Sequence, residues 1–144
     1  MTIRQISVFL ENKPGSLQRV LEALKTAGIQ LIASTLADTI DFGIYRMICS
    51  EPARAYDVLR NAGIAATFSD VFAVELDDKP GMAANAMEIF AHEDIGISYL
   101  YSFLLGGKGV LIFRTDNAER AREIIILERL KAITEEQLLT LAKG

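Results

Sequence analysis

The chain has 144 residues, 51% of them hydrophobic, and a formal net charge of -4 at pH 7. This length allows one ordinary domain or two small ones, and the hydrophobic content is ample for a core. The acidic charge and the lack of a Lys and Arg cluster argue against a nucleic-acid partner, while the absence of a long apolar run predicts a cytoplasmic protein with no membrane partner.

The first half of the chain predicts the order strand, helix, strand, strand, helix, strand. Apolar residues alternate in its first strand, and from Ser16 they recur at helical spacing. Serine and proline at the start of the second helix, and glycine after each helix, suit helix ends. The predicted strands are residues 3–10, 29–36, 42–49 and 64–69, and the predicted helices run from Ser16 to Gly28 and from Ser50 to Gly63.

The second half of the chain repeats the first at a shift of 66 positions. This shift aligns Lys13-Pro14-Gly15 with Lys79-Pro80-Gly81, and it aligns the apolar stripe of the first helix with apolar residues. The repeat therefore indicates a duplication. Its predicted strands are residues 71–76, 96–105, 109–115 and a short 131–133, its second helix is 117–130, and Thr134-Glu135-Glu136-Gln137 matches a capping box that opens a terminal helix.

This order predicts an α+β fold made of two ferredoxin-like βαββαβ units in tandem. Each unit should have an antiparallel sheet with both helices on one face. We place the first domain at residues 1–69 and the second, with the terminal helix, at residues 70–144. Strand residues 110–113 are apolar on both faces, so the second face also needs a cover, which predicts packing of sheet against sheet and a homodimer.

The loop Asn12-Lys13-Pro14-Gly15 is the first candidate for a binding site. It places a helix N-terminus, with free N–H groups and a partial positive charge, beside an amide side chain. Such a terminus suits a small carboxylate, and Gly15 leaves room for close approach. The alternative is structural: Pro-Gly makes a tight turn and Asn12 caps the helix.

Residues 6–17, followed by a helix and then Ala27-Gly28-Ile29-Gln30-Leu31, resemble the ACT domain. This family forms the regulatory modules of 3-phosphoglycerate dehydrogenase, aspartokinase and the acetolactate synthase small subunit. Residues 71–81 are similar to the same opening. The resemblance spans nearly the whole chain except the terminal helix, and it implies a non-catalytic domain that binds a free amino acid between paired domains and alters the activity of an enzyme.

The resemblance also implies a set of ligand-binding residues. Asn12 matches the family's ligand-binding asparagine, and Gln30 stands where many members carry an asparagine that faces the ligand of a neighbouring domain. In the second repeat, Asp78 replaces Asn12 and Gly96 replaces Gln30, so the first loop is expected to dominate. The predicted ligand-binding residues are Asn12, Lys13, Pro14, Gly15, Ser16, Gln30, Leu31 and Ile32 in the first repeat, and Asp78, Pro80, Gly81, Met82, Ile97 and Ser98 in the second.

Other functions find less support in the sequence. Tyr99, Tyr101 and Phe103 could stack on RNA bases, but they lie on the second strand of their unit, and the charge is acidic. The only histidine, His92, cannot form a metal site with a second histidine, and Cys49 is interpreted as a small buried hydrophobe. We therefore predict no catalytic residue, no metal, no cofactor and no enzyme activity.

The sequence thus predicts a regulatory protein that binds a free amino acid at the interface between ACT-like units. Since no catalytic domain is recognised in this sequence, its effect would reach a separate biosynthetic or catabolic enzyme. The alternative is a regulatory or structural subunit that has no ligand and acts through protein–protein assembly.

Overall fold

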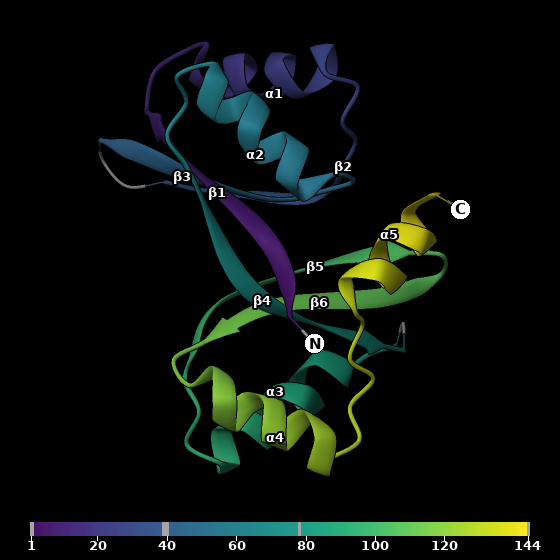
Figure 1. The fold of residues 1–144 in the computed structure, drawn as a ribbon. Coiled ribbons are helices and arrows are strands. Elements are labelled where there is room, and N and C mark those ends of the chain that lie inside the picture. Colours follow the sequence, from purple (N-terminus) through teal and green to yellow (C-terminus); the bar gives the residue numbers. More distant parts are fainter. Residues whose placement is uncertain (1, 39–40, 78, 144) are drawn as a thin grey trace. The chain divides into compact units, whose positions relative to one another are not determined.

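The computed structural model describes residues 2–38, 41–77 and 79–143 and divides into two compact units (Figure 1). The N-terminal unit comprises Arg4–Ser69, and the C-terminal unit comprises Asp70–Gly144 together with Met1–Ile3. The elements in chain order are β1 (Ile3–Glu11), α1 (Ser16–Thr26), β2 (Leu31–Asp38), β3 (Phe42–Cys49), α2 (Pro52–Asn61), β4 (Ala66–Leu76), α3 (Met82–His92), β5 (Ile97–Leu105), β6 (Lys108–Thr115), α4 (Ala118–Leu127) and α5 (Glu135–Lys143).

In the N-terminal unit, α1 and α2 lie on one face of an antiparallel sheet (Figure 1). The strand order is β2-β3-β1-β4, and β3 pairs with both β1 and β2. The amide of Phe9 donates to the carbonyl of Ala65 (3.2 Å) just before β4 begins. The core joins apolar residues of β1, such as Val8, to the inner faces of both helices, including Leu24 and Leu59.

The C-terminal unit repeats this arrangement with α3 and α4 on one face of a sheet of order β4-β6-β5 (Figure 1). Where the sequence predicted a closing strand at residues 131–133, the structure has an isolated antiparallel bridge between Val74 and Ala132 and no full strand. In the core below the helices, the rings of Phe90 and Phe113 lie 5.2 Å apart between centroids. The fold prediction of two tandem βαββαβ units is confirmed.

Several predicted strand boundaries are wrong. The separate strands expected at residues 64–69 and 71–76 are one continuous strand, β4, because no glycine or proline interrupts the extended backbone there. Strand β2 starts at residue 31 and not at 29, because the amide of Ile29 donates to the carbonyl of Leu24 (3.0 Å) and ties residues 28–29 to the end of α1. Part of the predicted hairpin, residues 39–40, lies outside the described residues.

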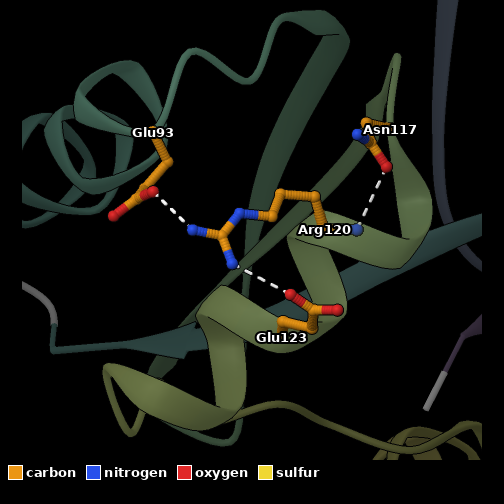
Figure 2. Close-up of polar contacts among 4 residues, drawn as sticks. All are labelled: Glu93, Asn117, Arg120 and Glu123. Atoms are coloured by element: carbon orange, nitrogen blue, oxygen red, sulfur yellow. Dashed lines mark hydrogen bonds and ion pairs between the residues drawn. The ribbon is translucent and has the colours of Figure 1, made fainter.

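Polar contacts hold the start of α4 (Figure 2). The side chain of Asn117 accepts a hydrogen bond from the amide of Arg120 (3.1 Å), which makes Asn117 the N-cap. The guanidinium of Arg120 contacts Glu123 (2.9 Å) on the same helix and Glu93 (2.6 Å) at the end of α3. These two carboxylates, Glu123 first, raise the pKa of Arg120 above its usual value. The contacts therefore connect the two helices of the C-terminal unit.

Helix α4 ends at Leu127, three residues earlier than predicted, because Arg129 takes a left-handed conformation (φ 55°). The predicted capping box before α5 is confirmed: the amide of Thr134 donates to the Gln137 side chain (2.9 Å), and the amide of Gln137 donates to the Thr134 hydroxyl (3.1 Å). Within the described part of the chain, none of the helices has the length and apolar character that crossing a membrane requires.

Candidate functional site

The strand-to-helix loops of the two repeats share one backbone geometry. Gly15 has φ 92° and ψ -15°, and Gly81 has φ 88° and ψ -6°, and in each repeat this glycine is the N-cap of the following helix. The carbonyl of Gly15 accepts from the amide of Arg19, and that of Gly81 from the amide of Asn85, both at 3.0 Å. The duplication seen in the sequence therefore extends to the turn that starts α1 and α3.

Asn12 does not cap α1, so the structural alternative considered for it fails. The N-cap is Gly15, and no side chain of the described residues caps the helix. The amide of Asn12 donates to the carbonyl of Asp41 (3.3 Å), and the residue is exposed. The first turn of α1 thus keeps backbone N–H groups without intrahelical acceptors, among them those of Leu17 and Gln18.

A cavity of about 500 Å³ in the N-terminal unit adjoins this first turn. One wall is the predicted segment 13–16, and the opposite wall is residues 63–65, which follow α2. Phe9 and Val20 add apolar surface, while Glu11 and Arg19 add charge. The cavity therefore combines apolar walls with charged groups of both signs at a helix N-terminus, and its volume lies in the range of small-molecule sites.

Arg19 is a second cation of this cavity besides Lys13, and the sequence analysis missed it. It lies one turn after Ser16 on α1, and its guanidinium donates a hydrogen bond to the carbonyl of Ala62 at the end of α2. A guanidinium carries five N–H donors, so this bond fixes its position and leaves donors for a second acceptor. Its spacing of one helical turn from the loop was the signal that could have identified it.

Glu11 and Lys13 form an exposed ion pair at the rim of the cavity, with 2.9 Å between Nζ and Oε2. The hydrogen bond and the charge of Lys13 lower the pKa of Glu11, so this carboxylate is ionised at neutral pH. Exposed pairs of this kind contribute little stability and exchange readily. The rim thus offers an anion and a cation that a charged ligand can engage.

Asn12 lies on the other side of the loop, at a smaller cavity of about 90 Å³ that also touches Leu36, Asp38 and Gly43. The second repeat has the corresponding cavity, of about 330 Å³, lined by Met82 among others. The structure therefore brings Lys13, Pro14, Gly15 and Ser16 together at the 500 Å³ cavity and leaves Asn12 out of it.

Gln30 stands at the far end of the N-terminal sheet from the loop. Glu11 pairs with Phe42 and Leu31 with Cys49, so seven residues of β3 separate the two ends, about 23 Å at strand spacing. The backbone of Gln30 is bonded to Ser50, at 3.1 Å and 2.9 Å, and its side chain is exposed. Asn12 and Gln30 of one unit therefore cannot contact one small ligand.

The predicted ligand residues at the starts of β2 and β5 divide into two kinds. Leu31 and its counterpart Ile97 pack against the cores of their own units. Ile32 and Ser98 lie at register shifts near the starts of β2 and β5. Such a bulge turns a side chain away from the regular alternation, and the sequence analysis did not anticipate it.

The second repeat offers a different set of groups. Asp78 lies outside the described residues, while Pro80 and Gly81 are exposed and Met82 is half-buried. At the position of Gln30, Gly96 donates its amide to the Asp116 carboxylate (3.0 Å), and a Cβ built there would lie 2.6 Å from that carboxylate. A side chain equivalent to Gln30 would therefore displace Asp116.

Comparison with known proteins identifies the family. Residues 1–142 match the family model described as ACT domain pair. The chain belongs to this family. Protein BT0572 from Bacteroides thetaiotaomicron is 32% identical, with a TM-score of 0.91 and 96% of each chain covered. The search of curated proteins found no match. The resemblance to the ACT domain stated from the sequence is confirmed.

Two more distant ACT domain structures share the fold. The regulatory subunit of aspartate kinase from Thermus thermophilus, in its ligand-free form, is 17% identical, with a TM-score of 0.59 over 86% of this chain and 90% of that one. A structure of aspartokinase alpha and beta subunits is 18% identical, with a TM-score of 0.56 over 85% and 88%. These two likenesses extend to the fold alone.

Proposed function

We propose that this ACT domain pair is a non-catalytic regulatory protein that binds a free amino acid in the 500 Å³ cavity of its N-terminal unit. The observation that carries the proposal is the meeting of Arg19 with the open first turn of α1 in this cavity. Both groups attract a carboxylate, and the helix terminus supplies backbone N–H donors. In the second repeat, Asn85 stands in place of Arg19 and Met82 in place of Ser16.

The remaining groups of the cavity suit the other parts of an amino acid. The ionised carboxylate of Glu11 is placed at the rim to receive the α-ammonium group in exchange for Lys13. Phe9 and Ile64 offer apolar surface to a side chain. A zwitterion with an aliphatic or aromatic side chain is therefore the ligand class that this cavity favours.

We further propose that ligand binding alters the activity of a separate enzyme of amino-acid metabolism, and that the protein acts in the cytoplasm as a homodimer. Binding would stabilise one arrangement of the ACT-like domains, for which we keep the limits 1–69 and 70–144, and so bias a partner. Because the length of the sheet separates Gln30 from Asn12, Gln30 would contact a ligand that is held by a loop outside its own unit.

A thermal-shift screen against the twenty amino acids tests the proposal. A ligand at one hundred times its Kd should stabilise the protein by about 2.7 kcal/mol. We expect a selective rise in Tm that Arg19→Ala abolishes. Asn85→Ala, the same position of the second repeat, is the matched control and should keep the full rise.

The same screen with Asn12→Ala separates the two sides of the loop. If Asn12→Ala abolishes the rise and Arg19→Ala leaves it intact, the ligand binds on the Asn12 side and the cavity assignment is wrong. A flat screen with every amino acid, under conditions where the protein is folded, would refute amino-acid binding and favour an assembly subunit.

A further inference from the structure

A fourth cavity, of about 880 Å³, lies in the C-terminal unit where α4, residues 129–133 and α5 meet. Its volume is in the range of small-molecule sites. It contains none of the residues predicted from the sequence, and it is distinct from the loop cavities. The terminal helix α5 (Figure 1) has no counterpart in the first repeat. Glu75 and residues 129–131 are the equivalents of Phe9 and residues 63–65 at the 500 Å³ cavity, and α5 adds the walls that the first repeat lacks.

The walls of this cavity are largely apolar. Ile126 is 61% exposed and Leu141 is 45% exposed, so both present apolar surface on the molecule. Ile125 and Leu130 add further apolar side chains. Exposed aliphatic residues that converge on one cavity give an apolar ligand a surface to cover.

Arg129 is the charged group that points to the ligand class. It occupies the position that Gly63 holds in the first repeat, and both residues have a positive φ, 55° and 76°. Glycine adopts this conformation freely, whereas a residue with a side chain is strained there. Asp94 has the same conformation (φ 57°) after α3, so the positive φ of Arg129 is the usual end of a helix, and it is the place of Arg129 in the lining of the cavity that makes its charge relevant.

The other charged groups of the cavity already have roles. Lys131 lies 3.9 Å from the carboxylate of Glu75, and Glu136 is in the first turn of α5, where the helix dipole favours an acid. Among the residues that the structure describes, no ion pair to Arg129 is found. Its positive charge is thus available to a ligand at the edge of an apolar cavity.

We propose that this cavity is a second binding site, for an apolar monocarboxylate whose carboxylate pairs with Arg129 and whose hydrocarbon part packs on Ile126, Leu130 and Leu141. Guanidinium and carboxylate form two parallel hydrogen bonds, and the apolar walls exclude water from one side of the pair. This site is distinct from the amino-acid site in the N-terminal unit, because the two share no lining residue.

Isoleucine-methyl NMR with 4-methylpentanoate and 3-phenylpropanoate as probes tests this site in the full chain. We expect saturable shifts of the Ile125 and Ile126 methyl signals with the acids and not with 4-methylpentan-1-ol, which lacks the charge. Leucine serves as a zwitterionic probe. If leucine shifts these methyls as strongly as the acids do, or if the alcohol does, the assignment to a monocarboxylate is overturned.

Arg129→Gly is the decisive variant, because it restores the glycine of the first repeat and should fold at least as well as the parent. It should weaken binding of the acids by about tenfold or more, as expected for the loss of a charged hydrogen bond. Arg122→Ala, which removes another exposed arginine of α4, is the control and should leave binding unchanged. If Arg129→Gly binds the acids as tightly as the parent does, the proposal is refuted. Arg19→Ala tests only the amino-acid site, so the failure of one proposal can be told from the failure of the other.

Discussion

Substitution of the two N-cap glycines by alanine should destabilise the protein by equal amounts. Gly15 and Gly81 have nearly the same positive φ, and a Cβ added at either position meets no atom within 4 Å. The cost is therefore that of the backbone conformation, about 1–2 kcal/mol for an L-residue in the left-handed region. The lower entropy of the unfolded chain with alanine offsets about 0.4–1 kcal/mol of it. We expect a net loss near 1 kcal/mol for each variant.

Denaturant unfolding followed by circular dichroism measures these losses, and the thermal-shift assay adds a functional readout. If the first loop holds the ligand, Gly15→Ala should also reduce the ligand-induced rise in Tm, because its methyl group adjoins the open turn of α1. Gly81→Ala should leave that rise unchanged. A loss above about 3 kcal/mol at either position, or clearly unequal losses, would refute the reasoning that only backbone conformation is at stake.

Three further predictions concern the core, the thiol and the helix contact. Phe90→Ala, which removes a fully buried ring tilted against that of Phe113, should lower the free energy of unfolding by about 3–5 kcal/mol, whereas Leu127→Ala on the surface should change it by less than about 0.5 kcal/mol in denaturant titrations. Burial raises the pKa of Cys49 to about 12. Between about pH 9 and 12 only the unfolded chain releases the thiol proton, so stability should fall with rising pH by about 1.4 kcal/mol per pH unit relative to Cys49→Ala. If the free energies of unfolding of the parent and of Cys49→Ala change with pH in the same way, this prediction is wrong. Arg120→Ala should lower Tm at low ionic strength, and the difference should shrink at about 1 M salt, where charges are screened beyond about 3 Å; a salt-independent difference would mean that packing and not charge connects α3 and α4.

The second repeat illustrates how a duplicated unit can diverge in chemistry while it keeps its backbone. The turns at Gly15 and Gly81 are the same, yet Arg19 becomes Asn85 and Gly63 becomes Arg129. Arg19 and Gly63 are neighbours in the first unit, where a Cβ built at Gly63 would lie 3.4 Å from Nη2 of Arg19, so the second repeat loses a cation at one position and gains one at the adjacent position. Helix α5, which has no counterpart in the first repeat, adds apolar walls there, and this is the basis for assigning different ligand classes to the two units.

The sequence by itself determined the tandem fold, the two loop turns and the capping box of α5. These features depend on local signals: the period of apolar residues, Pro-Gly at a strand end, and Thr and Gln at a fixed spacing. The match of residues 1–142 to the ACT domain pair agrees with that interpretation. Each such signal acts within one element or its ends, so it is visible without knowledge of the remainder of the chain.

Only the tertiary structure decided which side chains meet. Arg19 reaches the carbonyl of Ala62, 43 positions along the chain, and so joins the loop to residues 63–65 in one cavity. The length of β3 separates Gln30 from Asn12, although the resemblance had put both among the ligand residues. The α5 cavity is lined mostly by residues 125–141, and tertiary packing adds Glu75 of β4 to it. Such contacts depend on packing between elements, which no local periodicity encodes.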